Sequence, residues 1–324
     1  MSGEWKIMIN YLKETIDSII KPKKPKKKKA LVTGGHGFIG SHIVDALVKD
    51  DEFDEIRIID NQSSDAHEQF YISKSKKCVN FMFDIGDFDM IKNIFKDIDV
   101  VFHLAAESRI QPAIQNPTLA TRTNVTGTCN VLQAAREAGC DRVIYSSTSS
   151  AYGLKNTPPL KETMPNDCLN PYSVTKVAGE ELCKMYTKLF GLKTITFRYF
   201  NVYGDRQCTK GQYAPVIGLF LKQKAAGKSM TVVGDGLQTR DYTNVQDVVN
   251  ANLSAMVVKE GFGEIYNVGT GKEHTILDIV KMIGGKHKFL PERIGESRFT
   301  RANISKTKKV LNWEPTIKLK DYLK

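Results

Sequence analysis

The sequence predicts an α/β fold, a doubly wound parallel sheet with a smaller, discontinuous C-terminal region. Short runs of almost only apolar residues alternate with stretches of helical periodicity from residue 29 onward. Strands that are apolar throughout are typical of parallel sheets that helices cover on both faces. A glycine-rich turn directly after the first of these runs adds a local signal for the same fold class.

Six apolar runs give the expected strands, and the stretches between them give the expected helices. The runs are "ALVTG", "EIRIID", "VNFMFD", "DVVFHLAA", "DRVIYSS" and "TITFRYF". Helical periodicity is expected over residues 40–49, 88–96, 118–138 and 172–190. After about residue 205 the alternation loosens into longer loops that are rich in glycine and charge. We therefore expect a doubly wound α/β domain over residues 29–200, to which parts of 234–270 return, and a smaller region over 201–324 that closes over a ligand.

Residues 1–28 are expected to stand apart from this fold. Apolar side chains recur at helical spacing over residues 1–20, which predicts an amphipathic helix. A run of prolines and lysines follows, with seven lysines in residues 21–29. The formal net charge is +11, so the rest of the chain carries only +4. The run is interpreted first as a solvated linker. Contact of this lysine-rich tail with an anionic surface, either a membrane or nucleic acid, is the second interpretation, and no nucleic acid is expected to bind the body of the protein.

The composition argues against several classes of protein. With 324 residues, 41% of them apolar and 26% charged, the chain can bury a large core. No window approaches the ~18 to 20 apolar residues of a membrane span, and no secretory leader is recognisable, so a cytoplasmic location is expected. The six cysteines are scattered without a C-x-x-C pair or a histidine at ligand spacing, so no metal site is expected. His103, at the end of an apolar run, is interpreted as a packing residue rather than a catalyst.

The glycine-rich turn is the first candidate binding element. Gly34, Gly37 and Gly40 stand between the strand "ALVT" and a helix that is expected to begin near Phe38. Without side chains in the way, main-chain N–H groups and the helix N-terminus can approach a pyrophosphate. Glycines alone are weak evidence, because turns also use them for conformational reasons.

Two acidic strand ends strengthen this interpretation. Asp60 ends the run "EIRIID", 20 residues after Gly40, where a carboxylate can accept hydrogen bonds from the hydroxyls of an adenosine ribose. A carboxylate there also repels a 2′-phosphate, which favours NAD over NADP as the cofactor. Asp84 ends the next run and is suited to the adenine amino group.

A tyrosine and a lysine form the candidate catalytic pair. Tyr172 and Lys176 are four residues apart in an expected helix, so they share one helical face. There the ammonium group can lower the pKa of the phenol and make it a usable base near neutral pH. Thr148, in the hydroxyl-rich stretch "SSTSSAYG", lies 24 residues before Tyr172 and can share the proton with a substrate hydroxyl.

With these motifs in this order, the chain resembles the extended short-chain dehydrogenase/reductase superfamily, in its nucleotide-sugar epimerase and dehydratase branch. The resemblance runs from about Lys29 to the C-terminus. It implies an NAD-binding Rossmann domain over residues 29–200 and a mainly substrate-binding region, for the nucleotide-sugar, over 201–324. It rests on "TGGHGFIGSH", "DN" at 60–61, "HLAA" at 103–106, "NVTGTCNVL" at 124–132, "YSSTSSAYG", "PYSVTK", "RYFNVYG" at 198–204 and "GDGLQTRDY" at 234–242.

The resemblance implies roles for individual residues. It implies a catalytic set of Thr148, Tyr172 and Lys176. It implies an NAD site formed by Gly34, Gly37, Phe38, Ile39, Gly40, Asp60, Asn61, Asp84, Ile85, Leu104, Ala105, Ala106, Asn124, Ser146, Tyr172, Lys176, Tyr199 and Phe200. It implies substrate contacts from Ser108, Thr148, Asn201, Gln212, Tyr213, Val216, Val233, Arg240, Arg293 and Thr300.

Within this branch the residues after Thr148 bear on the reaction. Dehydratases of the branch carry an Asp-Glu pair there, whereas this chain has Ser149 and Ser150. Elimination of water is therefore disfavoured, and the resemblance implies NAD-dependent 4-epimerisation of a UDP-sugar by transient oxidation at C4. Another conversion on the same scaffold, by a 4,6-dehydratase, a decarboxylase or a reductase, remains an alternative, as does a non-catalytic NAD-binding regulator.

The resemblance also bears on the sugar and on assembly. Arg240 and Arg293 match phosphate-binding arginines of the family, and Val233 matches the uracil edge. Thr300 takes the position whose small size admits an N-acetyl group at C2 of the sugar. The loop over 107–114 departs from dedicated N-acetylhexosamine epimerases, so UDP-glucose and UDP-galactose stay open beside UDP-GlcNAc and UDP-GalNAc. A homodimer formed through the helices over 118–138 and 172–190 is implied as well.

Overall fold

The computed structural model describes Met8, Tyr11, Lys13 and residues 27–64, 67–209, 214–292 and 297–323. Apart from the three named residues, the expected helix over 1–20 and most of the lysine run lie outside these ranges.

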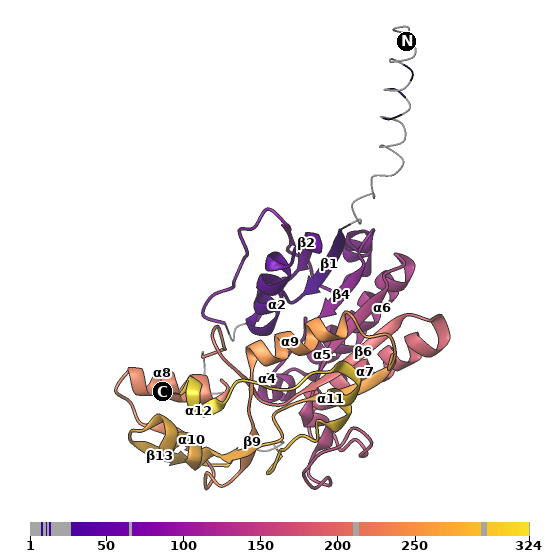
Figure 1. Cartoon of the computed structure of the whole chain (residues 1–324). Coiled ribbons are helices and arrows are strands. Elements are labelled where there is room, and N and C mark those ends of the chain that lie inside the picture. Colours follow the sequence, from indigo (N-terminus) through magenta and orange to yellow (C-terminus); the bar gives the residue numbers. More distant parts are fainter. Residues whose placement is uncertain are drawn as a thin grey trace.

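A seven-stranded parallel sheet forms the centre of the fold (Figure 1). Its strand order is β11-β6-β5-β4-β1-β2-β3, and every neighbouring pair is parallel. The strands are β1 (Lys28–Thr33), β2 (Phe53–Ile59), β3 (Cys78–Phe81), β4 (Val100–His103), β5 (Arg142–Thr148), β6 (Lys193–Tyr199) and β11 (Glu264–Val268). The predicted doubly wound α/β fold is confirmed.

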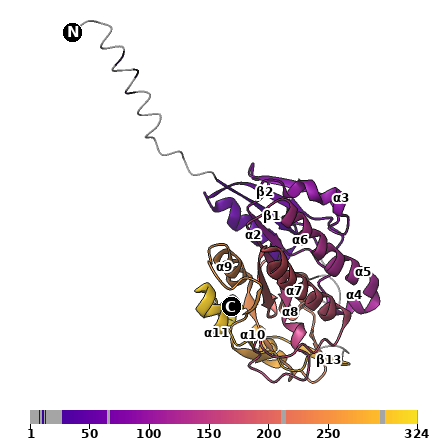
Figure 2. The same ribbon diagram turned by 90° about the vertical axis from the view of Figure 1, so that its right-hand side faces the viewer.

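Apolar side chains cover both faces of this sheet, as the continuous apolar strands predicted. On β1, Leu31 enters one core cluster while Ala30 and Val32 enter the other, because successive side chains of a strand point to opposite faces. Figure 2 shows α9 and α11 on one side of the sheet and α3 and α6 on the other. One cluster includes residues of α2 (Phe38–Lys49), α9 (Val245–Ala255) and α11 (Ser305–Leu311). The other includes residues of α3 (Phe88–Ile91), η1 (Lys92–Phe95), α6 (Gly127–Glu137) and α7 (Pro171–Phe190).

Helix α7 has well-defined ends. Asn170 accepts a hydrogen bond from the Ser173 N–H, and Pro171 occupies the first turn, where its missing N–H costs nothing. Gly191 ends the helix in the left-handed conformation, with φ of 71°. The sequence signals at both ends thus set where Tyr172 and Lys176 lie along the helix.

A smaller group of elements packs around a core of its own, at the lower left of Figure 1. Parallel strands β8 (Met230–Val233) and β13 (His287–Leu290) pair there beside α8 (Val216–Ala225) and α10 (Ile276–Ile283). The remaining short elements are β7 (Val202–Tyr203), β9 (Thr239–Asp241), β10 (Thr243–Asn244), β12 (Glu273–Thr275), α4 (Ile110–Gln115), α5 (Pro117–Thr121), η2 (Arg122–Thr126), η3 (Ser149–Tyr152) and α12 (Leu319–Tyr322).

The strand order also says where a ligand is expected. Strand β1 lies between β2 and β4. The chain therefore continues from β1 toward β2 and β3 on one side, and then returns to β4 on the other side. In open α/β sheets ligands bind at this reversal, outside the carboxyl ends of the strands. Among the described residues, no helix combines the length and the apolar character that crossing a membrane requires.

Candidate active site

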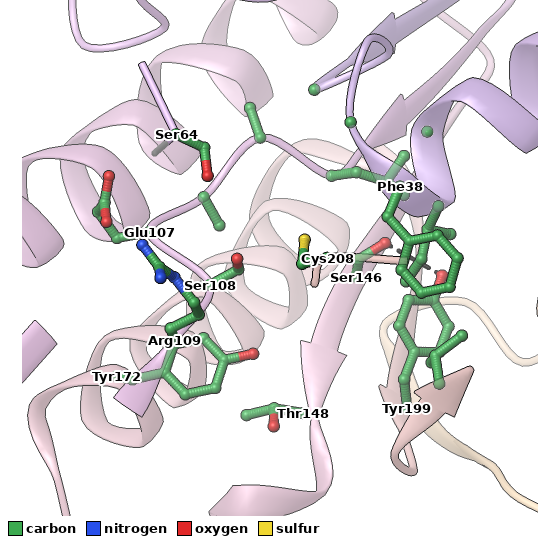
Figure 3. Close-up of a pocket in the computed structure, with 18 of the residues that line it drawn as sticks. Phe38, Ser64, Glu107, Ser108, Arg109, Ser146, Thr148, Tyr172, Tyr199 and Cys208 are labelled. Carbon is green, nitrogen blue, oxygen red and sulfur yellow. Dashed lines mark hydrogen bonds between the residues drawn. The ribbon is translucent and has the colours of Figure 1, made fainter. Parts of the chain in front are cut away.

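One pocket of about 520 Å³ runs along the carboxyl ends of the central strands. Its walls come from the turn after β1, the loop after β4, the end of β5, the first turns of α7 and the segments around β9 and Thr300. The close-up in Figure 3 shows Thr148 and Tyr172 at one end of the view, and Phe38, Ser146 and Tyr199 at the other.

The three glycines after β1 have different structural roles. A Cβ on Gly34 would lie 2.7 Å from the Ala105 nitrogen, and one on Gly40 would lie 2.1 Å from the Gly34 oxygen. These two glycines therefore let the turn, helix α2 and the loop after β4 pack closely. Gly37 is the N-cap of α2, and a Cβ there would lie 3.3 Å from His67 Nε2. Its lack of a side chain leaves the helix N-terminus facing the pocket, as an anion site requires.

Asp60 is held beside this turn by main-chain donors. Its Oδ2 accepts from the His36 N–H at 2.9 Å, and its Oδ1 accepts from the Gln62 N–H at 2.8 Å. The carboxylate oxygens keep further acceptor capacity, and the residue lines the pocket. Asp84 lines the same end, with its Oδ1 accepting from the Gly86 N–H.

Tyr172 and Lys176 lie together in the pocket, but their electrostatics differ from the expectation. Burial lowers the pKa of Lys176 from 10.5 to about 7. The pKa of Tyr172 is raised by burial, against which a hydrogen bond with Thr148 lowers it. The pKa of Tyr172 is therefore shifted upward and not downward as expected, because desolvation outweighs the hydrogen bond with Thr148.

His103 has the packing role that was expected from its position. It lies between the hydroxyl groups of Thr33, at 2.7 Å, and Thr128, at 2.9 Å. Complete burial, with the nearby Lys176 charge, lowers its pKa to about 3. The imidazole is therefore neutral at physiological pH and joins β1, β4 and α6.

At the other end of the pocket, the hydroxyl groups of Ser146 and Tyr199 lie close together. The Ser146 and Tyr199 hydroxyls are 3.0 Å apart, and Asn252 Nδ2 donates to the Tyr199 hydroxyl at 2.8 Å. Burial raises the pKa of Tyr199 to about 12, so it remains protonated.

On the other side, Arg240 and Thr300 are positioned by the smaller group of elements. Arg240 Nη1 donates to the main-chain oxygens of Thr239, at 2.9 Å, and Arg298, at 3.2 Å. Asn201 donates to Thr300 Oγ1 at 3.3 Å and to the Asp241 oxygen at 2.9 Å. These contacts orient an arginine and a small polar side chain toward one cavity.

Most of the residues singled out in the sequence come together here. The pocket is lined by Gly34, Gly37, Phe38, Ile39, Gly40, Asp60, Asn61, Asp84, Ile85, Leu104, Ala105, Ala106, Ser108, Ser146, Thr148, Tyr172, Lys176, Tyr199, Asn201, Arg240 and Thr300. Gln212, Tyr213 and Arg293 lie outside the described residues. The pocket lining does not include Asn124, Phe200, Val216 or Val233.

These four residues have other surroundings. Asn124 is fully buried, accepts from the Glu107 N–H at 2.8 Å and donates to the Glu107 oxygen at 3.0 Å, so it supports the pocket wall from behind. Phe200 packs in a small core with Tyr152. Val216 and Val233 are the first residue of α8 and the last of β8, and beside Val216 it is Pro215 and Ile217 that line the pocket.

The pocket also contains residues to which the sequence patterns assigned no individual role. They include Glu107 and Arg109 from the loop after β4, and His67, Phe70 and Cys208 from two loops that meet across the pocket. Cys208 Sγ lies 3.5 Å from His67 Nδ1. The one sequence signal for Glu107 and Arg109 is that they follow strand β4. No local sequence pattern indicates that residues 67 and 208 lie close together.

The comparisons with known proteins agree with this arrangement. A family profile described as GDP-mannose 4,6 dehydratase matches residues 31–324. The chain belongs to this family. The resemblance predicted from its motifs is thereby confirmed.

Similar proteins in this family are known from sequence and structure. The UDP-glucose 4-epimerase of Mycolicibacterium smegmatis is 35% identical over 301 residues, covering 90% of this chain and 95% of that protein. A solved UDP-N-acetylglucosamine 4-epimerase of Methanobrevibacter ruminantium, in complex with UDP-N-acetylmuramic acid, is 33% identical, with a TM-score of 0.86 over 92% of this chain and 96% of that chain. The UDP-glucuronic acid 4-epimerase of Bacillus cereus, solved with UDP-glucuronic acid and NAD, is 32% identical, with a TM-score of 0.82 over 91% of this chain and 96% of that chain.

Proposed function

We propose that this protein is an NAD-dependent 4-epimerase of UDP-sugars. The observation that carries the proposal is the convergence of Thr148, Tyr172 and Lys176 in the pocket that also holds the glycine turn and Asp60. The similar proteins named above are 4-epimerases, and one of them was solved with NAD.

The residues present fit NAD. Gly37 leaves the N-terminus of α2 open for a pyrophosphate, and the carboxylate of Asp60 suits ribose hydroxyls. The negative charge of Asp60 disfavours the 2′-phosphate of NADP. When bound, NAD supplies reversible hydride chemistry at C4 of the sugar.

The side chains of the pocket then divide the proton chemistry. Tyr172 Oη takes the proton of the sugar C4 hydroxyl and later returns it, while the Thr148 hydroxyl hydrogen-bonds to the phenol and orients the sugar. The charged form of Lys176 stabilises the phenolate, because the lysine side chain is buried and charges interact more strongly away from water. Since the pKa of Tyr172 is raised, this positive charge matters more than it would for an exposed tyrosine.

The neighbours of Thr148 favour epimerisation over elimination. Ser149 and Ser150 line the pocket beside it, and neither side chain is a carboxylic acid that can protonate a leaving hydroxyl. The 4-keto sugar, whose C4 is planar, can therefore turn over and receive the hydride on its other face. Such a turn needs a firm hold on the part that does not move, which Arg240 supplies by binding the diphosphate.

The sugar is proposed to be a hexose or an N-acetylhexosamine. Thr300 is a small wall residue, which leaves room for an acetamido group at C2. Incubation with UDP-glucose and with UDP-GlcNAc, without added NAD, tests the proposal by proton NMR of the anomeric signals. Formation of a C4 epimer is expected from at least one of them, and accumulation of a keto product with neither epimer would overturn it.

We also propose a homodimer. Val174 of α7, Leu119 of α5 and Ile114 of α4 are exposed apolar residues, and α4 and α5 both pack against α7. Burying such a surface against a second copy removes it from water. Sedimentation equilibrium measures the expected mass of two chains.

A further inference from the structure

A fully buried ion pair lies between the helix and the strand next to the candidate catalytic residues. Arg198 of β6 donates from Nη2 to Glu180 Oε2 at 2.6 Å and from Nε to Oε1 at 2.8 Å. The two side chains are 1% and 0% exposed. This is the two-pronged geometry in which a guanidinium group holds a carboxylate most firmly.

A third contact connects this pair to the strand that ends in Thr148. The Ser147 hydroxyl donates to Glu180 Oε1 at 2.5 Å, and Ser147 is paired with Arg198 in the register of β5 and β6. The carboxylate therefore joins three elements at one point. They carry Thr148 on β5, Lys176 on α7 and Tyr199 on β6.

The spacing along α7 makes this connection relevant to catalysis. Glu180 follows Lys176 by four residues and Tyr172 by eight, so all three project from the same side of the helix. Ser147 directly precedes Thr148. A fixed Glu180 thus sets both the rotation of the helix that carries the base and the position of the strand end that carries its hydrogen-bond partner.

Stability alone is a poor reason for such a pair. Taking two charges out of water costs so much that well-packed apolar replacements are often equally stable. Arg198 Nη1 is also buried without a hydrogen-bond partner in the described part of the chain. The guanidinium lies over the Tyr152 ring, 4.6 Å from its centre, which only partly compensates.

We propose that Glu180, held by Arg198, is a positioning residue for the reaction, which through Ser147 fixes Thr148 against Tyr172. The inference rests on the proposed function, because it concerns the geometry of that same proton transfer. Ser147 lines the pocket, but its hydroxyl donates to Glu180, and the proposal assigns no substrate contact to Glu180, Arg198 or Ser147.

The first test removes only the contact with the strand. Ser147→Ala keeps the ion pair and the shape of the core, and it is expected to lower kcat about tenfold, since small displacements of reacting groups have large effects on rate. The KM for the UDP-sugar and the midpoint of thermal unfolding are expected to stay near those of the wild type. Ser147→Thr keeps the hydroxyl and is expected to restore most of kcat.

Thr194→Ala is the matched control. Thr194 is a fully buried strand residue whose Oγ1 donates to the Cys183 oxygen of α7 at 3.0 Å, farther along the helix from Tyr172. The Thr194→Ala variant loses a strand-to-helix hydrogen bond like that of Ser147, but away from the site. Its kcat is expected to stay unchanged. Equal losses of kcat in Ser147→Ala and Thr194→Ala would overturn the inference.

A second variant separates positioning from stability. The double substitution Glu180→Leu with Arg198→Met replaces the pair by apolar side chains of similar size, so that no charge is left buried alone. On addition of UDP-sugar, the rate at which bound NAD is reduced is expected to be about tenfold or more lower than in the wild type. The midpoint of thermal unfolding is expected to stay similar. A folded double variant with the wild-type rate would overturn the inference, and so would an unfolded one, because the pair would then be essential to stability.

The two proposals fail in different ways. A wild-type protein without activity on UDP-sugars would refute the proposed function and, with it, this inference. An active wild type whose variants all match it would refute the inference alone.

Discussion

The ammonium nitrogen of Lys176 lies 4.3 Å from the centre of the Tyr145 ring, between helix α7 and strand β5. Both side chains are buried, with 3% and 0% of their surfaces exposed. An aromatic face attracts a cation, and in a site without water this attraction partly offsets the lost hydration. Lys176 nevertheless has a pKa of about 7, so the cost of burying its charge dominates.

This cost predicts how stability depends on pH. Lys176 releases its proton near pH 7 in the folded chain and near 10.5 when unfolded, so the unfolded chain binds more protons between these values. The contribution of Lys176 to the free energy of unfolding therefore rises with pH across this window. In protein freed of bound nucleotide, Lys176→Met is expected to be more stabilising at about pH 6 than at about pH 9, by about 1 to 3 kcal/mol. Urea titrations at both pH values measure this difference, and an equal effect at both would contradict the depressed pKa.

Tyr172→Phe is expected to abolish proton transfer and leave binding intact. The ring remains, so NAD stays bound, while kcat falls about 100-fold or more because the phenol oxygen that takes the proton is gone. Tyr186→Phe is the matched control, since Tyr186 lies on the same helix and its hydroxyl donates to Gln133 at 2.9 Å. A Tyr172→Phe enzyme with near-normal kcat would refute the assignment of the base.

Thr300→Tyr is expected to separate the two kinds of sugar. Thr300 is buried in the pocket wall, so a large side chain there fills the space of an acetamido group. The kcat/KM for UDP-GlcNAc is expected to fall about tenfold or more, while that for UDP-glucose changes little. Equal changes for both substrates would show that this wall does not select at C2.

Deletion of residues 1–26 is expected to leave epimerase activity unchanged. Strand β1 begins at Lys28, and among the residues that the structure describes none before Gly34 lines the pocket. The deleted segment carries four of the seven lysines in the basic run. Vesicles with anionic lipid and duplex DNA, each at low and high salt, tell whether the tail binds either surface. Loss of activity on deletion would contradict its separation from the enzyme.

The fold and much of the candidate site followed from local patterns in the sequence. The run "ALVT" and the turn after it predicted β1, Gly37 and the start of α2, because strand, turn and helix signals are adjacent in the chain. Asp60 was found because a fixed number of residues separates the turn from the end of the second strand.

Other features depend on contacts between distant segments, which a sequence pattern does not encode. Asn124 and Phe200 were expected at the NAD site, but their side chains turn into the protein interior. The raised pKa of Tyr172 follows from burial, which spacing does not reveal. The contact of Ser147 with Glu180 joins residues 33 positions apart and appears only when β5 and α7 pack together.

The most direct test of the account follows the hydrogen at C4. UDP-sugar that carries deuterium at C4 is incubated with the enzyme in ordinary water, without added NAD, and the product is analysed by NMR. If the hydride leaves C4 and returns to the opposite face, the C4 epimer is expected to keep its deuterium at C4. An epimer that has lost the label to water, or a keto product in place of an epimer, would contradict the account.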